Sequence, residues 1–291
     1  MRIMMIVKAN PDSEKGILPD EKILSAMGTY NEKLGKAGAL LAMDGLQPSS
    51  EGFRVKCSKG KVTVTDGPFA EAKELVAGFW LINVKSLAEG IEWAKRTPFQ
   101  DGEIELRPLF ETEDFPVSPD EDPEGWRKKE LENRAKAAPA RKPGTKRYLG
   151  LLLADRDTEA GVMPDEKVLA AMGAFFEEGL KAGVILGGEG LQPTSKAARV
   201  KFTAGKRTVV DGPFTESKEL VAGYAILQYA SKEEALEWTK RFVQVDAPGR
   251  MNSESVCELR PFFEIEDFPV DPAEKPGGWR DYETKFRDGV R

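Results

Sequence analysis

The chain has 291 residues, of which 40% are hydrophobic and 32% charged, carries a formal net charge of −6 and contains no histidine. This length and composition predict a soluble globular protein of about two domains, without the roughly 18-residue apolar run of a membrane span or the basic stripe of a nucleic-acid-binding surface. The lack of histidine excludes Ser-His-Asp and Cys-His catalysis and removes the commonest ligand of catalytic zinc.

The N-terminal apolar run, residues 3–7, predicts a central strand. It is too short for a signal peptide, because Lys8 and Pro11 interrupt it and no small-residue cleavage site follows. We therefore expect a cytoplasmic protein. A loop over residues 10–18 then leads to Pro19 and acidic residues, which are typical of a helix start, and the helix is expected to end near Gly38.

Further strands and one more helix follow in the first repeat. The turn at Lys59-Gly60 predicts a hairpin, and Ser86 is the expected N-cap of the helix. The strands are expected at residues 39–43, 54–56, 61–65, 76–84 and 104–110. This order predicts an α+β unit with helices on one face of a sheet. The opposite face of the sheet must also be covered. A second, similar sheet would cover it in an internal pseudo-dimer.

The whole pattern occurs twice. Asp66-Gly67-Pro68-Phe69 returns as Asp211-Gly212-Pro213-Phe214, at an offset of 145 positions, which indicates a tandem duplication. The offset grows to 153 in the last strand, so that eight extra residues lie within 244–255. We expect domains at 1–116 and 147–270, a linker with a charged helix at 117–146 and a C-terminal tail at 271–291. The aromatic residues of the two tails, Trp126 and Trp279 among them, are expected to pack on the body of the protein.

No cofactor or metal site is expected. The two cysteines, Cys57 and Cys257, do not occupy equivalent repeat positions, so they predict neither a disulfide framework nor a thiolate site. Without histidine only an oxygen-rich site for magnesium or calcium would be left, and the sequence has no EF-hand spacing. The glycine-rich residues 187–190 lack the lysine and hydroxyl residue of a phosphate-binding P-loop.

The repeated motifs resemble one known family. Asp-Gly-Pro-Phe followed by an apolar Val-Ala-Gly strand, the preceding Gly-Leu-Gln-Pro and the closing Glu-Leu-Arg-Pro are similar to the YCII-related (DGPF) domain family. The resemblance covers both repeats and implies ferredoxin-like units that pair into a dimeric α+β barrel, here within one chain. It also implies a family mostly of unknown activity, with relatives linked to lyase-like chemistry or encoded beside sigma-factor genes. Smaller members carry a catalytic His–Asp pair, of which only the aspartate has counterparts here, Asp66 and Asp211.

Asp66 and Asp211 are the candidate catalytic residues. Proline fixes its own backbone and restricts the preceding glycine, so each aspartate is held in one orientation. If Phe69 and Phe214 are buried beside the two aspartates, they would partly desolvate the carboxylates. This would raise the pKa of each aspartate and make it a better base. In the alternative interpretation, each aspartate caps its own turn by accepting backbone N–H bonds.

Five further pairs of equivalent residues are candidate ligand-binding groups. The arginines either hold a carboxylate-bearing ligand or pair with Asp66 and Asp211 as internal structure. The charged pairs that follow the Asp-Gly-Pro-Phe motifs either line a cleft mouth or form a solvated cluster. These candidates are Arg107 and Arg260, Gln47 and Gln192, Phe69 and Phe214, Glu71 and Glu216, and Lys73 and Lys218. The hairpin arginines Arg54 and Arg199 are more typical of surface residues.

Two functions fit these residues. The first is a small-molecule protein for an anionic metabolite, with cofactor-free acid–base or lyase-like chemistry. The second is a non-enzymatic regulatory or protein-interaction module, with a sigma factor as one partner. Whether the protein is an enzyme stays open. Because Trp80 is replaced by Ala225, Phe79 by Tyr224 and Tyr30 by Phe175, we expect unequal pockets and one ligand per chain.

Overall fold

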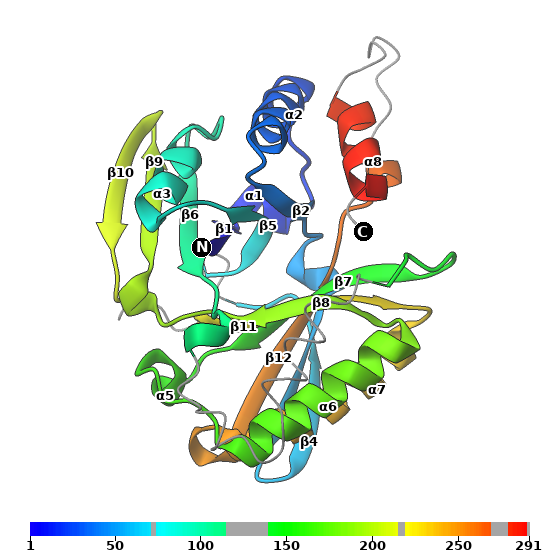
Figure 1. The fold of residues 1–291 in the computed structure, drawn as a ribbon. Helices are drawn as coiled ribbons and strands as arrows, with labels where there is room; N and C mark the ends of the chain where they lie inside the picture. Colours follow the sequence, from blue (N-terminus) through cyan, green and yellow to red (C-terminus); the bar gives the residue numbers. More distant parts are fainter. Residues whose placement is uncertain (71–73, 115–138, 215–218, 269–278, 290–291) are drawn as a thin grey trace.

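The computed structural model describes residues 1–70, 74–114, 139–214, 219–268 and 279–289. These residues form two six-stranded antiparallel sheets with helices on their outer faces (Figure 1). The first sheet has the order β10 (Lys206–Asp211), β9 (Ala198–Thr203), β6 (Gly102–Pro108), β1 (Arg2–Lys8), β5 (Val76–Asn83) and β2 (Leu40–Gly45). The second has the order β4 (Lys61–Asp66), β3 (Phe53–Ser58), β12 (Glu254–Pro261), β7 (Lys146–Leu153), β11 (Val221–Tyr229) and β8 (Ile185–Gly190).

The two repeats exchange their hairpins. β3 and β4 belong to the first repeat in sequence, but β3 pairs with β12 of the second, with Phe53 opposite Leu259. Reciprocally, β9 pairs with β6, with Ala198 opposite Leu106. The predicted hairpins therefore form, but each completes the sheet of the other repeat. We call the first sheet with its helices the first half and the second sheet with its helices the second half.

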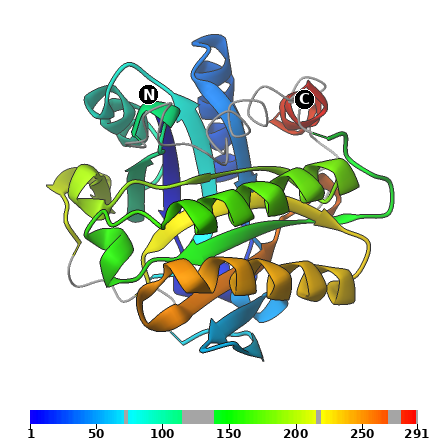
Figure 2. The ribbon, with the colours of Figure 1, turned by 60° about the horizontal axis from the view of Figure 1, so that its bottom comes forward.

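Capped helices cover the outer face of each sheet. In the first half these are α2 (Glu21–Lys36) and α3 (Leu87–Lys95), and in the second half α6 (Glu166–Ala182) and α7 (Lys232–Asp246). An aspartate or serine side chain caps each N-terminus, as Asp20 and the predicted Ser86 do in the first half. Figure 2 shows α6 and α7 side by side across the second sheet. None of the helices in the described ranges is long and apolar enough to cross a membrane.

Short helical turns occupy several connections. The expected loop over residues 10–18 contains α1 (Pro11–Glu14), which Asn10 caps, and its counterpart is α5 (Arg156–Glu159). The remaining 3₁₀ turns are η1 (Ser49–Glu51), η2 (Thr112–Asp114), η4 (Thr194–Lys196), η5 (Ala247–Gly249), η6 (Met251–Ser253) and η7 (Ile265–Asp267). The eight extra residues of the second repeat lie in the region where α7 extends beyond the length of α3 and is followed by η5 and η6.

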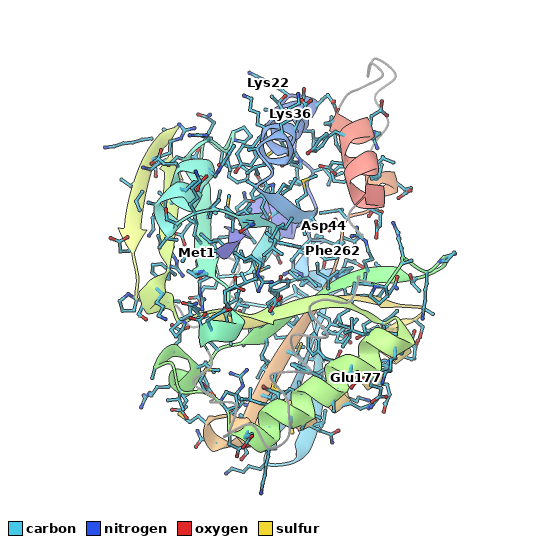
Figure 3. All side chains as sticks on the ribbon, viewed as in Figure 1. Met1, Lys22, Lys36, Asp44, Glu177 and Phe262 are labelled. Carbon is cyan, nitrogen blue, oxygen red and sulfur yellow. The ribbon has the colours of Figure 1, made fainter. Side chains whose placement is uncertain are left out.

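A shared apolar core joins the inner faces of the two sheets. Met4 and Ile6 of β1 and Leu149 and Leu151 of β7 belong to one buried cluster with Phe262, which Figure 3 labels in the middle of the molecule. This core covers the sheet faces that lack helices, as expected from the sequence. Separate apolar clusters lie between each sheet and its helices.

The C-terminal helix α8 (Trp279–Gly289) packs on α2. Trp279 is buried, and its indole nitrogen donates to Glu21 Oε1 at 3.1 Å. A Cβ atom on Gly28 would lie 2.3 Å from the Cβ of Trp279, so only glycine permits this approach. The expected packing of the second tail is thus present. Trp126 and the predicted charged helix of the linker lie outside the described residues.

Candidate functional site

Both candidate catalytic aspartates lie at exposed strand ends. Asp66 ends β4 with its side chain 65% exposed, and it accepts a hydrogen bond from Lys232 Nζ at 2.7 Å. Asp211 ends β10 and is also exposed. The expected desolvation of these carboxylates is therefore wrong. Both aspartates stand on the outermost strands of the exchanged hairpins, where solvent reaches them.

The Asp-Gly-Pro-Phe motifs join the hairpins to neighbouring turns. A Cβ atom on Gly67 would lie 1.8 Å from the carbonyl oxygen of Ser49, and one on Gly212 would lie 1.7 Å from that of Thr194. Both glycines precede cis prolines. The backbone N–H of Phe69 donates to Ser49 Oγ at 3.2 Å. The glycine of each motif is therefore required for close packing.

The two candidate ligand-binding arginines are fully buried and paired inside the protein. Arg107 donates to Glu105 at 3.1 Å and to the backbone carbonyl of Gln192 at 2.7 Å. Arg260 makes the equivalent contacts with Glu258 at 3.2 Å and with the carbonyl of Gln47 at 2.6 Å. In addition, Arg107 pairs with Glu159 and Arg260 with Glu14. The arginines thus pair internally, as one of the two interpretations has it, but their acidic partners are glutamates and not Asp66 and Asp211.

The hairpin arginines belong to the same clusters, so their interpretation as surface residues is wrong. Arg199 approaches Glu105 at 2.7 Å, and Lys8 lies 3.5 Å from the same carboxylate. Burial alone would raise the pKa of Glu105, but Lys8, Arg107 and Arg199 hold that pKa at about 2. In the second half, Arg54 contacts Glu258 at 2.7 Å and Leu153 replaces Lys8.

Some of the other candidate residues contact these clusters, and the rest lie outside the residues that the structure describes. The guanidinium of Arg54 lies 4.1 Å from the ring centre of Phe69, and that of Arg199 lies 3.9 Å from that of Phe214. The side-chain amides of the two glutamines bond to acidic side chains, Gln47 to Asp267 and Gln192 to Asp114. Glu71, Lys73, Glu216 and Lys218 lie outside the described residues.

A cavity of about 240 Å³ lies in the second half, between the sheet and helices α6 and α7. Its walls are mostly apolar and include Met172 and Phe176 of α6 and Trp238 and Phe242 of α7. Val162, which is 56% exposed, also lines it, so the cavity reaches solvent at the loop before α6. An apolar hollow of this kind is the ordinary form of a small-molecule site.

The floor of the cavity is a row of three residues with almost no side chain. Gly188 of β8 and Gly150 of β7 lie opposite Ala225 of β11, on either side of it. In the first half the corresponding row is Met43, Trp80 and Met5, with the same register. All three of these side chains are buried beneath α2 and α3.

A fourth residue that differs between the two halves is Asn31, the hydrogen-bond partner of Trp80. In the first half the Trp80 nitrogen donates to Asn31 Oδ1 at 2.8 Å, and both residues are buried. In the second half Asn31 is replaced by Phe176, so the polar partner is missing together with the indole that it would bind. At this position the cavity wall therefore has no buried amide that lacks a hydrogen-bond partner.

Comparison with known proteins agrees with the duplicated architecture. The family model described as the YCII-related domain matches residues 1–113 and again residues 150–260. The chain belongs to the YCII-related domain family. An uncharacterised protein of Rhizobium meliloti (strain 1021) is similar to it, with 34% identity over 93 residues, which cover 31% of this chain and 75% of that relative. The cavity floor and both ion-pair clusters lie within the ranges that match the YCII-related model.

Sequence reasoning found one of the three floor positions. The replacement of Trp80 by Ala225 suggested unequal pockets, and Ala225 lines the cavity, as do Tyr224 and Phe175. Gly150 and Gly188 were missed, although the repeat offset of 145 aligns them with Met5 and Met43. The signal was a large-to-small change repeated at aligned positions. The ligand stoichiometry stays a prediction.

Proposed function

We propose that this YCII-related protein binds one small, largely apolar molecule per chain in the cavity of its second half. The observation that carries this proposal is the row Gly188, Ala225 and Gly150, which opens the space that three buried side chains fill in the first half. An unfilled core hollow costs contacts and therefore stability. Because the equivalent layer of the first half is filled, the presence of this cavity supports a ligand-binding role for it.

The size of the cavity suits a ligand larger than benzene. An apolar protein cavity of about 150 Å³ stays dry and binds benzene, whereas this one measures about 240 Å³. Aromatic side chains line it on the side of the helices, which favours a flat or ring-bearing molecule. The proposed site therefore takes a one- or two-ring compound.

The direct test refills the cavity with the side chains of the first half. Ala225→Trp combined with Phe176→Asn supplies the indole and its amide partner. We expect this double variant to lose binding of a bicyclic probe, naphthalene, in calorimetric titration, with a thermal midpoint no lower than that of the parent. The single variant Phe176→Asn is the matched control. Naphthalene binding that persists in the filled variant, or that the parent lacks, would refute the proposal.

A second candidate function is cofactor-free acid–base or lyase-like chemistry with Asp66 and Asp211. The favouring observation is that, within the part of the chain that the structure describes, neither carboxylate caps its own turn. Arg107, Arg260, Gln47 and Gln192 would anchor an anionic substrate only by exchanging internal partners for it. Asp66→Asn with Asp211→Asn should abolish any turnover found by substrate screening. Unchanged turnover would remove the acid–base role, and capture of a sigma-type partner without any ligand would favour the regulatory alternative.

Two further predictions accompany the proposed function. The first is that the two halves are ferredoxin-like units in an intramolecular dimeric α+β barrel, supported by the shared core between the inner faces of the sheets. The second is a cytoplasmic location for the protein. A structure determined by crystallography and localisation of a tagged chain would test them.

A further inference from the structure

The cavity has one polar end, formed by residues from the region in which the second repeat is longer than the first. Asp246 and Arg250 line the cavity, and their side chains are only 1% and 5% exposed. Asp246 Oδ2 accepts from Arg250 Nε at 2.8 Å and from Ser255 Oγ at 2.6 Å. All three residues lie within positions 244–255, the region that contains the eight extra residues of the second repeat. The second repeat thus differs from the first both in the floor of the cavity and in the polar groups at its end.

One atom of each charged side chain lacks a hydrogen-bond partner among the described residues. Asp246 Oδ1 and Arg250 Nη1 are buried and make no hydrogen bond to any residue within the described ranges. A buried donor or acceptor without a partner costs free energy, and the cost is larger for charged groups. Here an unsatisfied acceptor and an unsatisfied donor belong to two neighbouring residues that both line one cavity.

We infer that these two atoms bind the polar end of the ligand, and that this end is an uncharged group with one donor and one acceptor, such as a hydroxyl. The inference rests on the proposed function of the cavity. The donor of the ligand would bond to Asp246 Oδ1 and its acceptor to Arg250 Nη1. A carboxylate would find the arginine already neutralised and would lie beside the Asp246 carboxylate, which disfavours it. The ligand class is thus a neutral, hydroxyl-bearing ring compound.

Three probes of matched shape test this assignment: naphthalene, 2-naphthol and 2-naphthoate, titrated at neutral pH into the full chain. We expect 2-naphthol to bind at least about tenfold more tightly than naphthalene, as a hydrogen bond to a charged group provides. We expect 2-naphthoate to bind more weakly than 2-naphthol. Equal affinities of naphthalene and 2-naphthol would overturn the inference and leave the proposed function intact, as would tightest binding of 2-naphthoate.

A matched variant locates the effect. Arg250→Lys keeps the charge beside Asp246 but removes Nη1, so we expect it to abolish the advantage of 2-naphthol over naphthalene. Arg141→Lys replaces an exposed arginine that pairs with Glu264 and does not line the cavity, and it should change neither affinity. A preserved advantage in Arg250→Lys would contradict the inference. If that variant does not fold, the probe series on the parent chain decides by itself. Failure of all three probes to bind the parent would instead refute the proposed function.

Discussion

The two halves of the molecule use the same row of sheet positions in opposite ways. Met43, Trp80 and Met5 fill the layer between sheet and helices in the first half, and the indole is fixed by a hydrogen bond to Asn31. Gly188, Ala225 and Gly150 leave that layer partly empty in the second half. Register and strand order are the same in both, so the two rows of sheet positions differ in their side chains alone. A duplicated fold can thus keep one copy as a filled core and open the other.

The exchanged hairpins explain how one half can tolerate the cavity. β3 and β4 complete the second sheet, β9 and β10 complete the first, and a single apolar core joins the two inner faces. Because the halves share strands and core, they should unfold together, and the filled half should contribute stability to both. The contrast between the halves can be tested from either side.

The largest expected effect follows from emptying the filled half. Trp80→Ala should lower the free energy of unfolding by about 3–5 kcal/mol, because it opens a cavity in a packed layer and removes the donor bound to Asn31. Urea unfolding at neutral pH measures this loss. Trp93→Ala, at a partly buried helical tryptophan, is the control and should cost less. A loss for Trp80→Ala no greater than that of the control would show that the first-half row is not a stabilising core.

The fold was largely predictable because its signals are local. Apolar runs, the Lys59-Gly60 turn and the caps Asp20 and Ser86 each depend on a few neighbouring residues. The exchange of hairpins was not predictable in this way. Residues 54–65 encode a hairpin, but their sequence does not say whether its edge pairs with β6 or with β12. That choice is made by tertiary packing, which also turned Arg54 and Arg199 from surface residues into partners of buried glutamates.

The candidate site was predictable only in part, for a related reason. Ala225 was visible as a replacement of Trp80 in the aligned repeats. That Gly150 and Gly188 flank it became clear only from the pairing of three strands, since β7 and β8 are far apart in sequence. The Asp-Gly-Pro-Phe motif attracted attention because it is repeated. In the structure its glycine provides a close backbone approach, which is a packing requirement that repetition alone cannot distinguish from chemistry.

The buried carboxylates give the next comparison. Glu105 has a pKa of about 2, below its ordinary value of 4.5, because three cations outweigh the effect of burial. A carboxyl group whose pKa is lowered by folding stabilises the fold at pH values above its ordinary pKa. This contribution is lost as the pH falls toward 2. The shift corresponds to about 3 kcal/mol. Glu105→Gln should therefore be less stable than the parent by roughly this amount at pH 6, and the difference should disappear near pH 2. Glu103→Gln, at a less buried partner of Arg199, is the control. A difference that is constant with pH would contradict this account.

The smallest expected effect distinguishes the two ion-pair clusters from each other. Lys8 lies 3.5 Å from Glu105, whereas the second half has Leu153 at the equivalent position. Lys8→Leu removes this difference between the two clusters. Replacing a buried charge by an apolar side chain is often nearly neutral when the remaining charges stay paired, and Glu105 keeps Arg107 and Arg199. We expect the free energy of unfolding to change by no more than about 1 kcal/mol at neutral pH.

The loss of one cation should nevertheless raise the pKa of Glu105, so acid unfolding should begin at a higher pH than in the parent. Lys85→Leu, which removes an exposed lysine, is the control for net charge. Coincident acid-unfolding curves for the two variants would mean that Lys8 does not act on Glu105.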